Sequence, residues 1–190
     1  MKRIWLLFLL LPLAAGAQTI SIPPVWVPSS PGVTRSLSGP YVEVGPVGPG
    51  AAKALRLTVA KKLEALNWKV RPLQKGTLQG DPVEAARTWA LGQRAPFAML
   101  VILYRWIERE GSDFGVERPA EVAFELALIR TRPGRLLWVK LLKERQRSLS
   151  EDLLKLGRFL RKGPKWLKAE ELAEALLEEA LRGHCRPSRW

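Results

Sequence analysis

The pattern of apolar and polar positions shifts along the chain between strict alternation and helical spacing. Residues 41–44 alternate between apolar and polar, and residues 68–73, Trp-Lys-Val-Arg-Pro-Leu, look like a second strand, so we expect a strand at each. Between them, residues 51–66 predict a helix whose apolar face is built from Leu55, Val59, Leu63 and Leu66. Asp81 followed by Pro82 supplies an N-cap and a first helical residue, which predicts a second helix.

The most apolar internal run, residues 96–107, is rich in branched and aromatic side chains. Its composition is typical of a central strand covered on both faces. Residues 121–130 alternate, and Pro133-Gly134 turns the chain into residues 135–143, which predicts an antiparallel hairpin. In this alternation Glu121 and Glu125 point away from the core. Two amphipathic helices are expected last, at residues 151–160 and 169–182.

This order of elements predicts an α/β (α+β) fold. We expect a mixed sheet of about five strands with helices packed on it, and a C-terminal antiparallel hairpin followed by two helices. Residues 41–183 suit a single domain in length. Residues 18–40 are rich in Pro, Ser and Gly, so an extended leader is expected there, and residues 184–190 are expected to form a disordered tail.

The first seventeen residues have the order of a secretion signal. Lys2 and Arg3 precede an apolar run, and the small residues that end at Ala17 suit cleavage after that residue. A retained membrane anchor is the alternative, but the apolar run is too short for a bilayer, which needs roughly twenty residues. We therefore expect export to the periplasm or cell envelope. Only two methionines and one cysteine are present, a scarcity of thermolabile residues that is typical of thermophiles.

Residues able to do catalysis are scarce. The one cysteine, Cys185, adjoins the one histidine, His184, so no internal disulfide and no cysteine-based metal site can form. A chelating pair there is the alternative to a disordered tail. Nucleophilic catalysis lacks a histidine base in the expected core. The glycine-rich loop at 45–50 contains Pro46 and Pro49, which lack the N–H donors that a phosphate loop uses. We expect no enzyme, no cofactor and no metal.

Acidic residues gather between the expected strands, at Glu108, Glu110, Asp113, Glu117, Glu121 and Glu125. A metal or glycosidase site is one interpretation. Arginines alternate with these carboxylates at Arg105, Arg109 and Arg118, however, and would neutralise them locally. We therefore expect a solvated face of ion pairs.

The formal net charge of +13 is concentrated in one region. Residues 131–168 hold twelve Lys and Arg against three Asp and Glu. The candidate binding residues are Arg145, Arg147, Lys155, Arg158, Arg161, Lys162, Lys165 and Trp166. Such a surface would attract lipid headgroups, an anionic polymer or an acidic protein face, and specific nucleic-acid recognition is not expected because phosphate attraction is largely blind to sequence. Ordinary solubilisation by surface charge is the alternative.

Several runs resemble, in order, a family of uncharacterised bacterial envelope lipoproteins. They span residues 104–111, 118–129, 134–138, 146–153 and 157–173, with Gln-x-x-Leu-Ser-Glu at 146–151 and Gly-x-x-Trp-Leu at 163–167 as the more specific elements. That family is similar to the α/β periplasmic domains of the curli-secretion channel lipoprotein and of lipoprotein activators of peptidoglycan synthases. Members carry a lipid-modified cysteine after the signal where this chain has Gln18, so we expect no acylation there.

The resemblance implies a non-catalytic module that binds partners in the periplasm. We expect the chain to be a partner-binding or scaffold module of a periplasmic or outer-membrane assembly, with an envelope protein as its partner. The alternative is a protein that binds an anionic polymer or a membrane surface through the basic 145–168 region.

Overall fold

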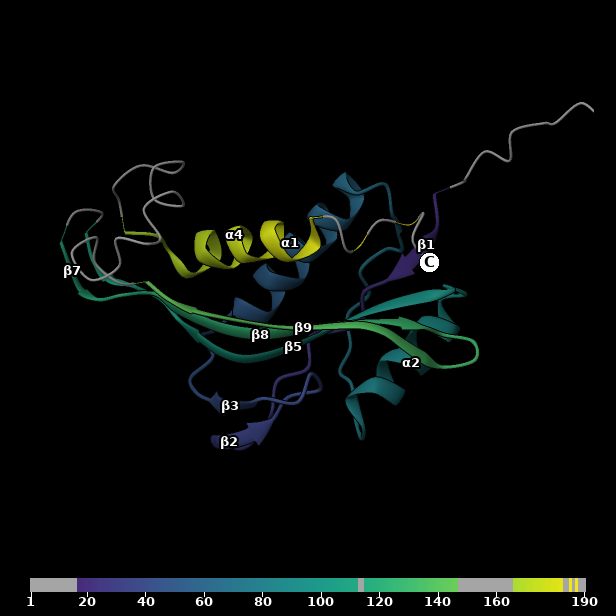
Figure 1. Cartoon of the computed structure of the whole chain (residues 1–190), viewed down its shortest axis with the longest axis horizontal. Helices are drawn as coiled ribbons and strands as arrows, with labels where there is room; N and C mark the ends of the chain where they lie inside the picture. The colour runs from purple at the N-terminus through teal and green to yellow at the C-terminus, as the bar shows by residue number, and fades with distance from the viewer. Residues whose placement is uncertain (1–16, 113–114, 147–165, 183–184, 186, 188–190) are drawn as a thin grey trace, which may run out of the picture.

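The computed structural model describes residues 17–112, 115–146, 166–182, 185 and 187, which form a sheet with a layer on each face (Figure 1). The strands and helices are β1 (Thr19–Ser21), β2 (Gly32–Arg35), β3 (Tyr41–Val44), α1 (Ala51–Ala65), β4 (Lys69–Val70), α2 (Pro82–Gly92), β5 (Phe97–Ile107), β6 (Glu110–Gly111), β7 (Val116–Arg118), β8 (Glu121–Arg130), β9 (Arg135–Arg145) and α4 (Ala169–Leu181). The expected signal peptide and the expected helix at 151–160 lie outside the described residues.

The main sheet has five strands in the order β4-β1-β5-β8-β9. β1 runs parallel to both β4 and β5, whereas β5, β8 and β9 are antiparallel. The α+β class and the mixed five-stranded sheet are therefore confirmed. The hairpin of β8 and β9 turns at Pro133-Gly134, as expected, and leaves β9 at one edge of the sheet.

Each face of the sheet carries its own apolar layer. α1 and α4 cover one face, where Met99, Val101 and Leu103 of β5 meet Phe124 and Leu126 of β8. α2 and the β2–β3 hairpin cover the other face, over the intervening residues of the same strands. β5 and β8 are thus buried on both sides, which explains the nearly unbroken apolar run of β5.

The N-terminal segment differs from its prediction. Residues 18–40 were expected to form an extended leader, but β1 lies inside the sheet, with Ile20 and Ile22 buried. Trp26 continues along β5: its N–H donates to the Val101 carbonyl at 2.9 Å, and its carbonyl accepts from Leu103 N–H at 2.8 Å. The leader prediction is wrong here because a strand of three residues carries too little periodic signal, and its position depends on distant partners.

The structure also differs from the predictions for residues 41–44 and for the tail at 184–190. The strand predicted at 41–44 is present as β3, but it pairs with β2 in a separate two-stranded sheet. The predicted tail at 184–190 contains a buried residue, because Cys185 has no exposed surface and its carbonyl accepts a hydrogen bond from Trp68 Nε1 at 2.6 Å. β1 takes the place in the five-stranded sheet that β3 was expected to occupy.

Candidate functional site

The structure describes two of the eight residues predicted to bind a partner. Arg145 is exposed at the end of β9, and Trp166 is half-buried, with its carbonyl accepting a hydrogen bond from Arg109 Nη1 at 3.0 Å. The two ends of the basic 145–168 region are in contact, because Gln146 Oε1 accepts a hydrogen bond from Leu167 N–H at 2.7 Å. The other six, Arg147, Lys155, Arg158, Arg161, Lys162 and Lys165, lie outside the described residues.

The edge strand β9 presents a surface that sequence reasoning did not single out. It extends over 11 residues and, among the described strands, pairs with β8 alone. Leu136 is 39% exposed, and Leu137, Trp138, Val139 and Leu141 are only partly buried. The neighbouring β8, which has a strand on each side, buries every residue from Val122 to Ile129. Within the described part of the chain β9 has a strand on one side only, which explains its half-exposed apolar side chains.

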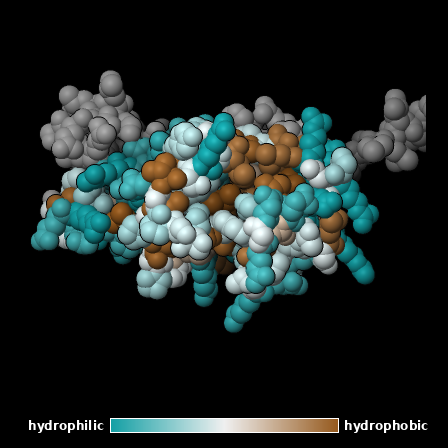
Figure 2. All heavy atoms as spheres, turned by 90° about the horizontal axis from the view of Figure 1, so that it is seen from below, coloured by the Kyte–Doolittle hydropathy of each residue, from teal (hydrophilic) through white to brown (hydrophobic). Residues whose placement is uncertain are grey.

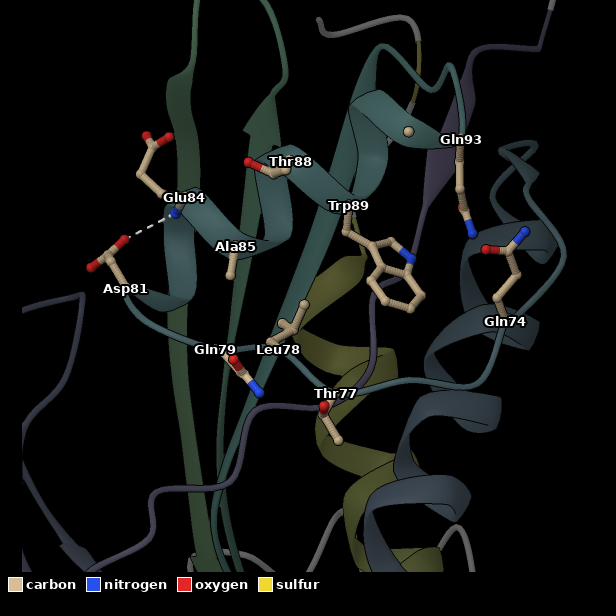
Figure 3. Close-up of a pocket in the computed structure, with 11 residues that line it drawn as sticks. Gln74, Thr77, Leu78, Gln79, Asp81, Glu84, Ala85, Thr88, Trp89 and Gln93 are labelled. Atoms are coloured by element: carbon tan, nitrogen blue, oxygen red, sulfur yellow. Dashed lines mark hydrogen bonds between the residues drawn. The ribbon is translucent and has the colours of Figure 1, made fainter.

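A polar cleft of about 640 Å³ lies between α2 and the irregular strap of residues 71–80 (Figure 3). Its walls carry amide and hydroxyl side chains, at Gln74, Thr77, Gln79, Thr88 and Gln93. Figure 3 shows the Trp89 indole pointing between helix and strap, with Gln74 and Gln93 on the side of its nitrogen. Gly76 packs against that ring so closely that a Cβ there would come within 2.5 Å of it.

The carboxylates beside this cleft have structural roles. Asp81 Oδ1 caps α2 by accepting from the N–H groups of Val83 and Glu84, at 3.0 and 2.9 Å. Glu84 pairs with Arg87 at 3.3 Å. Neither carboxylate is hydrogen-bonded to a nucleophile, so the cleft lacks the paired groups of a hydrolytic site.

A second hollow, of about 810 Å³, separates the strap from the β2–β3 hairpin on the same side of the sheet. Its walls combine apolar side chains, among them Val25, Trp26 and Val33, with the hydroxyl groups of Ser29 and Ser30. Figure 2 views this side of the molecule and shows apolar surface gathered in its middle. Val33 and Tyr41 of the hairpin are 70% and 71% exposed.

Glu125 is the main correction among the acidic residues. The alternation of β8 predicted that it points away from the core, yet it is 1% exposed. Its carboxylate accepts hydrogen bonds from Tyr104 Oη at 2.8 Å, Leu37 N–H at 2.9 Å and Ser38 N–H at 2.8 Å. The prediction failed because β8 is covered on both faces. The small and apolar residues that share its face, Ala123, Ala127 and Ile129, were the available signal.

The remaining acidic residues follow the expected ion-pair interpretation in part. Arg105 pairs with Glu43 at 2.6 Å and also with Glu121, and Arg118 pairs with Glu110 at 3.4 Å. Glu108 instead accepts from Trp106 Nε1 at 2.7 Å and from the first N–H of α4, at Ala169. Asp113 lies outside the described residues. Within the residues that the structure describes, no three His, Cys, Asp or Glu side chains are placed to hold a metal ion.

Burial also raises the pKa values of two titratable groups, Cys185 and Tyr104. It raises the pKa of the Cys185 thiol to about 12, so the thiol is protonated at neutral pH. Burial, together with the hydrogen bond to Glu125, raises the pKa of Tyr104. Both groups favour their neutral forms inside the protein. Among the described helices none has both the length and the apolar character to cross a bilayer.

Comparison with known proteins gives a fold relationship. No family model and no curated protein matches the chain. The chain is similar to the PelC dodecamer from Paraburkholderia phytofirmans, with a TM-score of 0.50 and 16% identity over 89% of each chain. A PelC dodecamer from the same organism with one leucine-to-methionine substitution gives a TM-score of 0.51, also at 16% identity and 89% of each chain. Lipoprotein GNA1162 from Neisseria meningitidis has 13% identity and a TM-score of 0.46, over 77% of this chain and 99% of that one.

The similarity to the PelC dodecamers supports the fold described above. At such identities the likeness concerns the fold alone. The relationship to the curli-secretion channel and to activators of peptidoglycan synthases stays a prediction.

Proposed function

We propose that the chain is an exported, non-catalytic envelope protein that acts as a partner-binding or scaffold module of a periplasmic or outer-membrane assembly. The observation that carries this proposal is the β9 edge, which combines 11 residues of extended backbone with half-exposed apolar side chains. Edges of this length are avoided or covered in proteins that act alone, because they pair with other chains. A partner protein would cover this edge.

Two further observations support the proposal. Three of the described carboxylates have structural roles: Asp81 caps α2, Glu84 pairs with Arg87, and Glu125 accepts hydrogen bonds from Tyr104 and from two backbone N–H groups. The solved structures with a similar fold include a protein that assembles as a dodecamer. Export rests on the residues before Gln18, with cleavage after Ala17 and no acylated cysteine following.

Export and assembly can be tested together. The full chain would be expressed in its host with a C-terminal tag, and the cell would be fractionated after chemical crosslinking. We expect the chain in the periplasmic or envelope fraction, with an N-terminus at Gln18, inside crosslinked species well above the 21.3 kDa of the uncleaved chain. Retention in the cytosol, or turnover of a substrate by the purified chain, would refute the proposal.

The net charge of +13 favours a second candidate, a protein that binds an anionic polymer or a membrane surface through the basic 145–168 region. Binding of this kind weakens steeply as salt rises, because counterions compete with the lysines and arginines. Vesicles containing phosphatidylglycerol would be titrated at low and at moderate salt. Loss of binding in moderate salt and in a charge-reversal variant at Arg158, Arg161 and Lys165 would support this candidate. Unchanged binding in that variant would exclude it.

A further inference from the structure

The β9 edge offers hydrogen-bonding groups along its whole length. In an antiparallel pair, alternate residues direct their N–H and C=O groups away from the partner strand. β9 pairs with β8 from Arg135 to Arg145, so its outward groups form a row along the edge. Among the described residues, no backbone hydrogen bond from another segment reaches that row. The opposite edge of the sheet, β4, has only 2 residues and is too short to serve in the same way.

Charge decides which kind of strand fits. Over its 11 residues β9 carries four cationic side chains, Arg135, Lys140, Lys143 and Arg145, against one carboxylate, Glu144. The cations lie on both sides of the strand. Lys140 shares a face with Trp138 and Leu142, beside α1 and α4, whereas Lys143 alternates with Val139 and Leu141 on the other face.

A second copy of this chain, paired along the full length of β9, is a poor occupant. Two β9 strands paired antiparallel about Lys140 would place Lys140 opposite itself and Arg135 opposite Arg145. Like charges directly opposite each other destabilise a strand pair. A strand with carboxylates opposite the cations would form favourable cross-strand ion pairs at these positions. It would also cover the apolar side chains between them.

We propose that β9 binds an extended, acidic segment of a protein partner, which adds to the sheet as a sixth strand. This inference rests on the proposed function, because it names the chemistry of the partner. Backbone hydrogen bonds along the edge provide affinity, and the cations at 140, 143 and 145 select carboxylates over other side chains. The competing view is that these cations only protect a bare edge from aggregation, as edge lysines do in many sheets.

A pair of synthetic peptides tests the proposal in solution. Both are 11 residues long with capped ends and apolar positions opposite those of β9, and one carries Glu where the other carries Lys. We expect the purified chain to bind the Glu peptide about tenfold more tightly at low salt, because each of two cross-strand ion pairs changes affinity by about threefold. Fluorescence anisotropy of labelled peptide gives both affinities.

Charge reversal on β9 supplies the decisive variant. Lys140→Glu/Lys143→Glu should reverse the preference, and the fold should survive because both side chains are exposed. Lys53→Glu/Lys61→Glu, on the exposed face of α1, makes the same change in net charge and should leave the preference unaltered. Equal binding of the two peptides, binding of neither, or an equal response in both variants would overturn the proposal.

Site-specific photocrosslinking in the host separates this inference from the proposed function. A benzophenone amino acid would replace Leu136 or Lys140 on β9, or Lys53 or Lys61 on α1. We expect the β9 positions to crosslink to a net-acidic segment of another protein. Protein crosslinks from α1 alone would overturn the inference and leave the proposed function standing. A β9 crosslink to a second copy would overturn the acidic partner, and no crosslink from any position would remove both.

Discussion

Removal of the Glu125 carboxylate should detach the β2–β3 hairpin from the sheet. Glu125 sits on β8 and reaches across to the turn that joins β2 and β3, where it accepts from the N–H groups of Leu37 and Ser38. Tyr104 Oη on β5 donates to the same carboxylate. One buried side chain therefore satisfies three donors and fixes the position of the turn.

The geometry sets the size of the effect. Glu125→Ala leaves three donors without their acceptor, and each buried donor that loses its partner costs about 1–3 kcal/mol. Water that enters the space left by the side chain can satisfy some of them, so we expect a loss of about 3–5 kcal/mol in the free energy of unfolding. Tyr104→Phe removes one of the three hydrogen bonds and should cost about 1–2 kcal/mol.

Urea unfolding followed by circular dichroism measures both values, and amide exchange at Leu37 and Ser38 reports whether the turn is released. Glu64→Ala, on the exposed surface of α1, is the matched control and should change stability by less than about 0.5 kcal/mol. A cost for Glu125→Ala as small as that of Glu64→Ala would refute the account of Glu125 as the anchor of the hairpin.

Three further predictions concern single residues. Asp81→Ala removes the cap on α2 and should lower the free energy of unfolding by about 1 kcal/mol, whereas Asp81→Ser should retain most of it, both by thermal melting. Trp68→Phe removes the indole donor to the Cys185 carbonyl and should speed the reaction of Cys185 with a thiol reagent about tenfold, since a hydrogen bond of about 1.4 kcal/mol is lost. Burial raises the pKa of Cys185 from 9.0 to about 12, so its contribution to stability is complete below the first value and is lost as pH rises toward the second. Urea titrations should show a steeper decline in the unsubstituted chain than in Cys185→Ala, because the raised pKa of Tyr104 makes both chains less stable at alkaline pH.

Local patterns were sufficient for most elements of this fold. The helices α1 and α2 followed from apolar spacing and from the cap at Asp81, and the β8–β9 hairpin followed from alternation and the turn at Pro133-Gly134. β1 was missed because its role depends on parallel pairing with Lys69 and Phe97, residues far along the chain. A strand of three residues is too short to show an alternating pattern, so its pairing with distant segments cannot be predicted from its own sequence.

The candidate site was harder to predict than the fold. Net charge drew attention to residues 145–168, but charge alone does not distinguish a binding surface from a solubilising one. The β9 edge became visible only when the strand order was known, because the sequence of an edge strand with apolar residues on both faces resembles that of a central strand. Glu125 was misplaced for a related reason: an alternating pattern with one buried face also fits a strand buried on both.

The strength of peptide binding to β9 and its preference for acidic peptides should depend on different residues. Glu125 is the register partner of Leu141, so the anchored turn lies next to the face of β9 that carries Val139 and Leu141, whereas α4 contacts β9 elsewhere. Glu125→Gln weakens the attachment of the β2–β3 turn, so Val139 and Leu141 would be held less firmly by the residues packed behind them. We therefore expect weaker binding of the acidic peptide. It should not change the preference for Glu over Lys, because the cations at 140 and 143 are untouched. The same anisotropy titrations measure both quantities, and loss of the charge preference in Glu125→Gln would show that recognition depends on the hairpin instead of on β9.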